Sequence, residues 1–334
     1  MRMIKGIVIN VNEFGVVYSD DSIEEIAKLI NLYAIIKDFR SIRDNLDILA
    51  DAEVVCTGWG GIQFDEKVLG IAKNLKVVLY GGGSIRAVVT KSFWEHDIII
   101  SSASGANAVP VAQYTLSQIL ACLKGIWRYA RAMQLQRRFL GREVFVVPGG
   151  YNSTVGLISL GMIGQKVCSY LQDMDDIKVI AYDPYIDKQQ AEALGVEMCS
   201  LEEVFSSSDV ISVHAPLLEE TKGMIGEKLF ASMKPNSSFI NTARGAVVRE
   251  QEMIKILKSR QDITAILDVT DPEPPMHDSP LYGMSNVVLT PHISGSLQEE
   301  CKRHGKYMVD ELRRYVMGQP LKWAIKHEEF AFRA

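Results

Sequence analysis

Three residues of complementary chemistry each follow a short apolar run that is typical of a β-strand. Arg244 lies in "INTARGAVV", Glu273 in "LDVTDPEPP" and His292 in "LTPHISG". An arginine between a strand and a helix can direct its planar guanidinium at a carboxylate. A histidine paired with a glutamate forms a general acid–base pair, because the carboxylate fixes the tautomer of the imidazole and favours its protonated form. Hydride transfer to a carbonyl needs a proton donor at the oxygen and a group that binds the negative end of the substrate. These three residues supply both.

Each of the three residues taken alone has a simpler interpretation. His292 follows a proline and would fit a loop or packing role, Arg244 would fit a surface cation, and Glu273 would fit an acidic turn. Their shared position after predicted strands favours the chemical interpretation, because ligands of parallel sheets bind at the carboxyl ends of the strands.

The segment "TVGLISLGMIGQKV", residues 154–167, resembles a phosphate-binding turn that lacks its first glycine. The strand "STVGLI" leads into the helix "MIGQKVCSYLQDM", as a dinucleotide loop requires. We expect Gly161 to let the backbone approach a pyrophosphate and Gly164 to let helix and strand pack closely. Ser159 takes the place of the turn glycine, and we expect it to fit without a positive φ if the turn relaxes slightly.

An acidic residue in the next strand strengthens this prediction. Asp183 follows Gly164 by nineteen residues, at the end of "VIAYD". A carboxylate there can accept hydrogen bonds from the adenosine ribose hydroxyls and repel a 2′-phosphate. A chance glycine-rich turn would explain the loop alone, but not this order of strand, loop, helix, strand and acid. The sequence therefore predicts a dinucleotide site that prefers NAD to NADP.

Strands and helices alternate along the whole chain, which predicts an α/β protein with two parallel-sheet domains of the Rossmann or flavodoxin type. We expect residues 1–105 with 294–334 to form the substrate-binding domain and residues 106–293 the NAD-binding domain, with a hinge near 101–107 and 292–296. In the first block we read strands in "GIVINV", "AEVVCTG", "LKVVLYGGG" and "HDIIISSA", and helices over 22–38 and from about Pro110 to Met133. The second block reads as strands "KVIAYD", "DVISVHA", "SSFINTA", "ITAILDV" and "NVVLTP", and the last forty residues as helical.

The composition limits the kinds of molecule that the protein is expected to bind. The 334 residues carry a net charge of −5, which argues against a nucleic-acid surface. No apolar stretch approaches the roughly 20 residues of a membrane helix, and the N-terminus does not suggest a secretory signal. The five cysteines include no C-x-x-C pair, so we expect reduced, mostly buried thiols and no metal site. These features favour a cytoplasmic protein with no membrane or nucleic-acid partner.

The motifs "GLISLGMIG", "YDP", "SVHAPL", "INTARGAVV", "LDVTDPEPP" and "LTPHISG", in this order and spacing, resemble those of the D-isomer-specific 2-hydroxyacid dehydrogenases. The resemblance covers nearly the whole chain and is strongest over about 150–296. It implies two α/β domains with a cofactor cleft between them, the first built from both chain termini. It also implies an oxidoreductase that transfers a hydride between NAD(H) and a 2-oxo acid or D-2-hydroxy acid, and a homodimer formed through the NAD-binding domain.

The resemblance also implies roles for individual residues. Arg244 would bind the substrate carboxylate and polarise its carbonyl, His292 would transfer the proton, and Glu273 would hold His292. The segment around Met162 and Ile163 would bind the pyrophosphate and Asp183 the ribose, while His214, Ala215 and Pro216 would line the adenine side and Thr242, Ala243 and Asp268 would lie near the nicotinamide. The other residues implied in cofactor binding are Gly161, Gly164, Pro184, Thr221, Arg244, His292 and Gly295.

The first domain carries the remaining candidates. In "YGGGSIR" the backbone N–H groups of Gly82 and Gly83 would hold the substrate carboxylate. Trp59, in "CTGWGG", could form the wall of a substrate pocket or pack beneath the loop. Arg86 could bind a second anionic or polyhydroxy group of the substrate or could be a solvated cation.

Two departures narrow the substrate class that the resemblance implies. Phosphoglycerate-oxidising members often carry an added regulatory domain, for which we expect no room here, and formate-oxidising relatives replace the glutamate that Glu273 supplies. Both point to a 2-oxo acid reductase whose substrate the sequence does not identify. The alternative is a non-catalytic NAD(H)-sensing protein similar to the corepressor relatives, although a sensor has no need of a proton donor.

Overall fold

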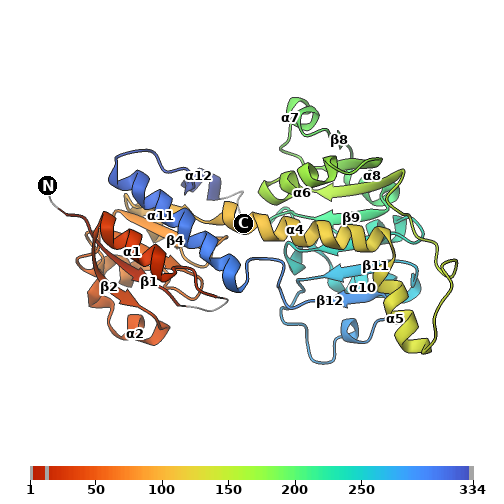
Figure 1. Cartoon of the computed structure of the whole chain (residues 1–334), viewed down its shortest axis with the longest axis horizontal. Coiled ribbons are helices and arrows are strands. Elements are labelled where there is room, and N and C mark those ends of the chain that lie inside the picture. The colour runs from red at the N-terminus through yellow and green to blue at the C-terminus, as the bar shows by residue number, and fades with distance from the viewer. Residues whose placement is uncertain (1–2, 12–14, 331–334) are drawn as a thin grey trace. The chain divides into compact units, whose positions relative to one another are not determined.

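The computed structural model describes residues 3–11 and 15–330 and divides the chain into two compact units (Figure 1). The first unit joins residues 1–108 to 296–334, and the second spans 109–295. Each unit contains one mainly or wholly parallel sheet with helices, so the predicted α/β class is confirmed. Among the described residues, no helix is long and apolar enough to cross a membrane.

The sheet of the first unit has the strand order β13-β5-β4-β3-β1-β2. All neighbours pair in parallel except β13, which pairs antiparallel with β5. Strands β3 and β4 are buried along their whole length, which explains their continuous apolar runs. The strands are β1 (Lys5–Ile9), β2 (Asn31–Ile36), β3 (Val54–Gly58), β4 (Val77–Gly81), β5 (Ile99–Ser102) and β13 (Ala324–Ile325).

The helices of this unit include one from the C-terminal part of the chain, α11 (Lys302–Val316), which packs against α1 and β4 (Figure 1). The sequence expectation that the last forty residues are helical therefore holds for α11, while β13 within them was not predicted. The other helices are α1 (Asp20–Leu29), α2 (Phe39–Asp44), α3 (Glu66–Ile71) and α12 (His327–Phe330), with short 3₁₀ turns at η1 (Leu46–Leu49), η2 (Ser92–Glu95) and η5 (Gln298–Cys301).

The helix predicted over 22–38 is wrong in its second half. Helix α1 ends where Ile30 adopts an extended conformation, and Asn31–Ile36 forms β2. The apolar residues of this segment fit helical spacing, but β2 pairs along β1 from Lys5↔Asn31 to Ile9↔Ile36. Sheet pairing is a non-local contact that overrides local periodicity.

The sheet of the second unit is parallel throughout, with the order β12-β11-β10-β9-β6-β7-β8. The five strands predicted after the glycine segment are present, and the two-residue β8 was not predicted. The strands are β6 (Ser153–Ile158), β7 (Ile177–Tyr182), β8 (Glu197–Met198), β9 (Val210–Val213), β10 (Ser238–Asn241), β11 (Thr264–Leu267) and β12 (Val287–Leu289).

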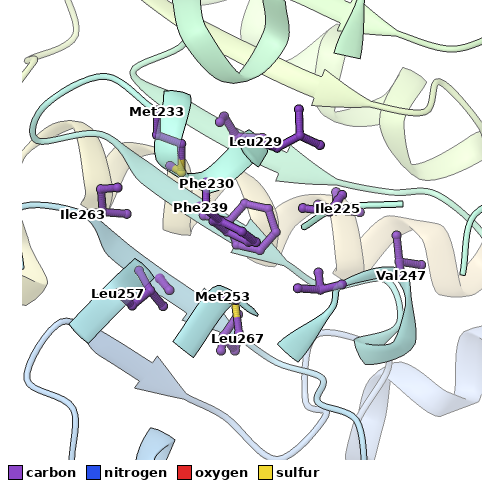
Figure 2. Packing of buried hydrophobic residues seen from close by; sticks show 14 of the residues in the cluster. Ile225, Leu229, Phe230, Met233, Phe239, Val247, Met253, Leu257, Ile263 and Leu267 are labelled. Carbon is purple, nitrogen blue, oxygen red and sulfur yellow. The ribbon is translucent and has the colours of Figure 1, made fainter. Parts of the chain in front are cut away.

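Helices cover this sheet, and the buried apolar residues of the unit form two clusters. Figure 2 shows part of one cluster, where Phe230, Met233 and Leu257 of the helical layer gather around Phe239 of β10. The rings of Phe230 and Phe239 meet edge to face with centroids 4.9 Å apart. The helices are α4 (Ser104–Leu123), α5 (Ile126–Gln136), α6 (Met162–Gln172), α7 (Lys188–Ala193), α8 (Leu201–Ser207), α9 (Glu227–Ser232) and α10 (Glu250–Ser259), with 3₁₀ turns η3 (Gly245–Val247) and η4 (Pro280–Tyr282).

The single helix predicted from Pro110 to Met133 is two helices. Helix α4 starts earlier, at Ser104, and contains Pro110, whereas α5 begins after a break at Gly125. Gly125 has a left-handed backbone with φ of +62°. A Cβ at this position would lie 2.5 Å from Cγ1 of Val147. The helix therefore breaks where the segment with Val147 packs against Gly125. Local periodicity does not reveal this non-local contact.

We predict that Gly125→Ala destabilises the protein. The left-handed conformation costs a non-glycine residue about 1–2 kcal/mol, and displacement of Val147 adds to this cost. Gly149→Ala is the matched control, because Gly149 has φ of +77° but open space where its Cβ would lie. Urea unfolding should give a larger loss for Gly125→Ala than for Gly149→Ala, and equal losses would contradict the packing argument.

Candidate functional site

The glycine segment forms a tight turn between β6 and α6. Gly161 is the N-cap residue of α6 and has no side chain to cap the helix. A Cβ at Gly161 would meet no atom within 4 Å, so no neighbouring group crowds this residue. A helix N-terminus such as this one, with Met162 and Ile163 in its first turn, suits an anion, because the helix dipole places partial positive charge there.

Ser159 adopts the left-handed conformation that the sequence analysis expected it to avoid. Its φ is +74°, so the expected relaxation of the turn is wrong. The reason is the packing of α6 on the turn, since a Cβ at Gly164 would lie 2.2 Å from the Ser159 carbonyl oxygen. Helix α6 thus packs closely on the turn at Gly164, and Ser159 in that turn adopts a conformation that glycine usually supplies.

Asp183, directly after β7, is held against the same turn. Its Oδ2 accepts hydrogen bonds from the Leu160 N–H at 2.7 Å and the Ser159 hydroxyl at 3.3 Å. Its Oδ1 accepts one from the Tyr185 N–H at 2.8 Å. Each carboxylate oxygen can accept more than one hydrogen bond. Asp183 is therefore fixed in orientation and keeps acceptor capacity for a hydroxyl group, with Pro184 exposed beside it.

His214 lies at the end of β9 and is buried. Its N–H donates to the Ile158 carbonyl at 2.8 Å, which ties the strand end to β6. Neither ring nitrogen has a hydrogen-bond partner within the described part of the chain. Burial lowers the pKa of His214 to about 3. The imidazole is therefore neutral near pH 7, and its Cδ2 lies 3.7 Å from where a Cβ of Gly164 would be.

The segment after His214 closes a small turn. Ala215 is buried, and the Pro216 carbonyl accepts a hydrogen bond from the Thr221 hydroxyl at 2.5 Å. The same hydroxyl accepts one from the Leu218 N–H at 2.8 Å. Thr221 therefore fixes the backbone that follows β9.

Asp268, after β11, is a buried carboxylate that organises the segment carrying His292. It accepts hydrogen bonds from the Thr290 hydroxyl at 2.6 Å and from the N–H groups of Ile293 and Ser294 at 2.9 Å each. The His292 N–H donates to the Asp268 carbonyl at 2.9 Å. These bonds hold His292 in a left-handed conformation, with φ of +54°. The sequence analysis did not foresee the part played by Thr290, although a hydroxyl residue at a strand end was a visible signal.

His292 and Glu273 form a direct pair. Nδ1 of His292 lies 2.6 Å from Oε1 of Glu273, and both side chains are roughly half exposed. Because an ionised carboxylate only accepts, Nδ1 carries the proton and Nε2 is left to exchange one with a reactant. The arrangement is that of an acid–base group whose tautomer is fixed by its partner.

The turn that carries Glu273 is itself anchored. The Thr270 hydroxyl donates to the Pro272 carbonyl at 2.8 Å, and the Asp271 N–H donates to Glu250 at 3.0 Å. Partial burial raises the pKa of Glu250. Glu273 therefore projects from a segment fixed at two points.

Arg244 follows β10 and lies beside the segment after β11. A Cβ at Gly245 would lie 2.0 Å from the Thr270 carbonyl carbon, so only a glycine allows the two segments to meet this closely. Asn241 donates to the Arg244 carbonyl at 3.0 Å, and the Arg244 guanidinium donates to the Ala243 carbonyl at 2.6 Å. The hydroxyls of Thr242 and Thr115 lie 3.3 Å apart. The "ARG" segment is thus held by its neighbours on both sides.

The sheet order brings the predicted residues of the second unit to one edge. Strands β12, β11 and β10 are adjacent, and His292, Asp268 with Glu273, and Arg244 follow them in that order. Other residues proposed for the cofactor follow β9, β6 and β7, the next three strands, and Gly295 ends the unit. Parallel strands present their carboxyl ends at the same edge.

The remaining candidates lie in the first unit. A Cβ at Gly82 would lie 2.5 Å from the Tyr80 ring, and one at Gly83 would lie 3.5 Å from Nδ2 of Asn107. The Trp59 ring lies 4.7 Å from that of His304, centroid to centroid, which gives Trp59 a packing contact. His304 was not among the predicted site residues.

Arg86 is exposed and contacts the C-terminal segment. Its guanidinium donates to the Phe330 carbonyl at 3.2 Å and lies 5.0 Å from the centroid of the Phe330 ring. Neither contact was anticipated, because the sequence separation of 244 residues hides it.

Potential metal ligands and cysteines can be compared with the sequence expectations over residues 3–11 and 15–330. No group of three or more His, Cys, Asp or Glu side chains in these ranges could hold a metal ion. All five cysteines are free thiols, of which Cys199 alone is partly exposed.

Residues 116–294 match the family model "D-isomer specific 2-hydroxyacid dehydrogenase, NAD binding domain". The chain belongs to the D-isomer-specific 2-hydroxyacid dehydrogenase family. It is 32% identical over 279 residues to the D-3-phosphoglycerate dehydrogenase of Methanocaldococcus jannaschii, a match that covers 82% of this chain and 52% of that protein. It is 31% identical over 265 residues to the enzyme of the same name from Archaeoglobus fulgidus, covering 78% and 49%. The chain thus spans about half the length of these curated relatives.

Solved structures share the fold of this family member. An NAD-complexed D-isomer-specific 2-hydroxyacid dehydrogenase from Lactobacillus delbrueckii ssp. bulgaricus has a TM-score of 0.80 at 23% identity, covering 96% of this chain and all of that one. An acyclic imino acid reductase in complex with NADPH and D-Arg has a TM-score of 0.77 at 23% identity, with the same coverage. At this identity the likeness concerns the fold alone.

We predict that the buried His214 makes the protein less stable in acid. Its native pKa of about 3 lies below that of the unfolded chain, so the unfolded chain binds a proton that the native state excludes. The free energy of unfolding should therefore fall as pH drops below about 6.5, by about 1.4 kcal/mol per pH unit for this one group. Urea unfolding between pH 7 and pH 5 measures the slope.

Substitution identifies the group responsible. His214→Asn should flatten the pH slope by about one proton, whereas His277→Asn, at an exposed position, should leave it unchanged. Identical slopes in the wild type and His214→Asn would show that His214 does not titrate as its burial requires.

Proposed function

We propose that the chain is an NAD(H)-dependent oxidoreductase that reduces a 2-oxo acid to the D-2-hydroxy acid or catalyses the reverse reaction. The observation that carries the proposal is the 2.6 Å contact between His292 and Glu273. The family, the names of the curated relatives and the position of Arg244 on the neighbouring strand end all support it.

The residues of the glycine segment fit a dinucleotide. The N-terminus of α6, where no atom crowds Gly161, would hold the pyrophosphate. Asp183 keeps acceptor capacity for the ribose hydroxyls, and its charge disfavours a 2′-phosphate, so we assign a preference for NADH over NADPH. His214, Ala215 and Pro216 would lie on the adenine side, and Thr221 would hold the backbone beside them. When bound, NADH supplies the hydride.

The protein groups then manage charge and the proton. Arg244 would hold the substrate carboxylate and stabilise the negative charge that develops on the 2-oxo group. As the hydride adds to C2, protonated His292 would give the proton on Nε2 to the carbonyl oxygen, which yields the hydroxyl. Glu273 would stabilise His292 while it is charged. We assign the N–H groups of Gly82 and Gly83 to the substrate carboxylate.

A protein that only sensed NAD(H) would use fewer of these features. Binding of a dinucleotide does not need an imidazole whose tautomer is fixed by a carboxylate, nor a buried aspartate that positions it. The dehydrogenase proposal accounts for both.

The test is oxidation of NADH or NADPH at 340 nm with a panel of 2-oxo acids, from glyoxylate and pyruvate through hydroxypyruvate to branched, aromatic and sugar-derived members. We expect turnover with NADH and little with NADPH. His292→Gln should lower kcat by about 10²–10⁴-fold, the usual contribution of general acid–base catalysis, and leave NADH affinity within a few-fold. The matched control His277→Gln should behave as the wild type.

Each other outcome has a definite meaning. Wild-type turnover by His292→Gln would overturn the role of His292. A wild type that binds NADH but reduces no member of the panel would favour a sensor over a 2-oxo acid reductase. Comparable rates with both cofactors would overturn the assignment of Asp183.

We further propose that the chain forms a homodimer through its second unit. Helix α5 has no buried residue, and several large apolar side chains on it and after it are exposed, including Leu135, Phe139, Val146 and Tyr151. Exposed apolar patches of this kind mark protein interfaces.

Sedimentation at micromolar protein should give a dimer for the wild type. Phe139→Glu, which places a charge at a side chain that is 86% exposed in the isolated chain, should shift the protein toward monomer. Met317→Glu, at an exposed position of the first unit, is the control and should remain dimeric. A monomeric wild type would reject the proposal.

A further inference from the structure

A buried histidine outside the proposed acid–base pair contacts the start of the glycine loop. His304 of α11 has no exposed surface. Its Nδ1 lies 3.3 Å from the Gly81 carbonyl oxygen, and its Nε2 lies 2.8 Å from the Ser296 hydroxyl. The Trp59 ring covers it at a centroid distance of 4.7 Å. Both polar atoms of a fully buried ring are therefore used.

The chemistry of the partners sets the tautomer. The Gly81 carbonyl can only accept a hydrogen bond, so Nδ1 of His304 carries the proton. In the neutral ring Nε2 then has a lone pair and accepts from the Ser296 hydroxyl. Burial lowers the pKa of His304 to about 4, against the opposing effect of the Gly81 carbonyl and with a further lowering by the positive charge of Arg303. The neutral ring is therefore the form present near pH 7.

Gly81 is the last residue of β4, and the loop with Gly82 and Gly83 begins at its carbonyl. The Gly81 C=O and the Gly82 N–H belong to one planar peptide unit. In a trans peptide the two groups point in opposite directions, and the cis bonds of the described chain lie elsewhere. A hydrogen bond from His304 to the Gly81 oxygen therefore aims the Gly82 N–H away from α11.

The same histidine is linked to the far side of the loop. The Ser296 N–H donates to Oδ1 of Asn107 at 3.0 Å. Nδ2 of Asn107 lies 3.5 Å from where a Cβ of Gly83 would be. Helix α11 is fixed in place, since a Cβ at Gly305 would lie 2.2 Å from the Val17 carbonyl oxygen. His304 is therefore hydrogen-bonded to the carbonyl that precedes Gly82, and Ser296 and Asn107 connect it to the surroundings of Gly83.

We infer that His304 is a positioning residue for the reaction, whose neutral imidazole orients the Gly81–Gly82 peptide so that its N–H meets the substrate carboxylate. The inference rests on the proposed function. It concerns binding of the 2-oxo acid in the first unit and leaves the dinucleotide residues of the second unit untouched. A histidine that merely filled space would not need either hydrogen bond.

Three substitutions separate the two hydrogen bonds. His304→Asn retains a donor near the position of Nδ1, His304→Gln retains a polar group near the position of Nε2, and His304→Leu retains neither. We expect the KM for the best 2-oxo acid to rise by about tenfold in His304→Leu and His304→Gln, because a lost hydrogen bond of this kind is worth about one power of ten. His304→Asn should stay within about threefold of the wild type. In all three, kcat and NADH affinity should change by less than about threefold, as expected when ground-state binding alone is lost.

Two further measurements do not depend on turnover. In ¹⁵N-histidine-labelled protein, the imidazole whose signal is lost in His304→Leu should be neutral in the wild type at pH 7, with its proton on Nδ1. Hydrogen exchange of the peptide covering residues 80–86 should be faster in His304→Leu than in His304→Asn.

The outcomes distinguish the inference from the proposed function. Absence of turnover by the wild type overturns the function, while the tautomer and the exchange rates still decide whether His304 holds the loop. In an active wild type, an unchanged KM in His304→Leu overturns the inference alone. Equal effects of Asn, Gln and Leu, a proton on Nε2, or unchanged exchange would also overturn it.

Discussion

The buried carboxylate of Asp268 is the contact on which the geometry of the second unit depends most. It accepts three hydrogen bonds from the segment after β12 and places His292 in a left-handed conformation. A buried charge is costly unless hydrogen bonds satisfy it. The N–H groups of Ile293 and Ser294 and the Thr290 hydroxyl supply these hydrogen bonds. If the segment moved, the buried carboxylate would lose them at a cost in free energy. The position of His292 is therefore set by an aspartate that need not take part in the chemistry.

Close backbone contacts extend this constraint along the sheet edge. At Gly245 the arginine segment touches the backbone of Thr270, and at Gly164 the first turn of α6 touches the carbonyl of Ser159. In both places a Cβ would collide with a neighbouring main chain. The glycines of this family member thus serve two ends, because Gly161 faces open space while Gly164 and Gly245 permit packing.

The sequence indicates which candidate residues come together where their placement depends on local order, and their roles stay predictions. Arg244, Glu273 and His292 stand directly after apolar runs, and adjacent parallel strands bring their ends together by rule. The predictions failed where a distant segment decides the conformation. Strand β2 forms because it pairs with β1. The helix breaks at Gly125 where Val147 packs against it, and Ser159 has a positive φ where helix α6 packs on its carbonyl at Gly164. His304 escaped notice for the same reason, since its partners Gly81 and Ser296 are remote or unremarkable in sequence.

Three histidines show how environment assigns different tasks to one side chain. His292 is half exposed and paired with a carboxylate, which suits a group that must gain and lose a proton. His214 and His304 are buried, and burial lowers the pKa of both, so each remains neutral where His292 would have to work. They differ in turn, because both ring nitrogens of His304 have protein partners whereas those of His214 have none among the described residues. A satisfied buried imidazole holds other groups in place. An unsatisfied one, such as His214, keeps the full free-energy cost of burying its polar atoms.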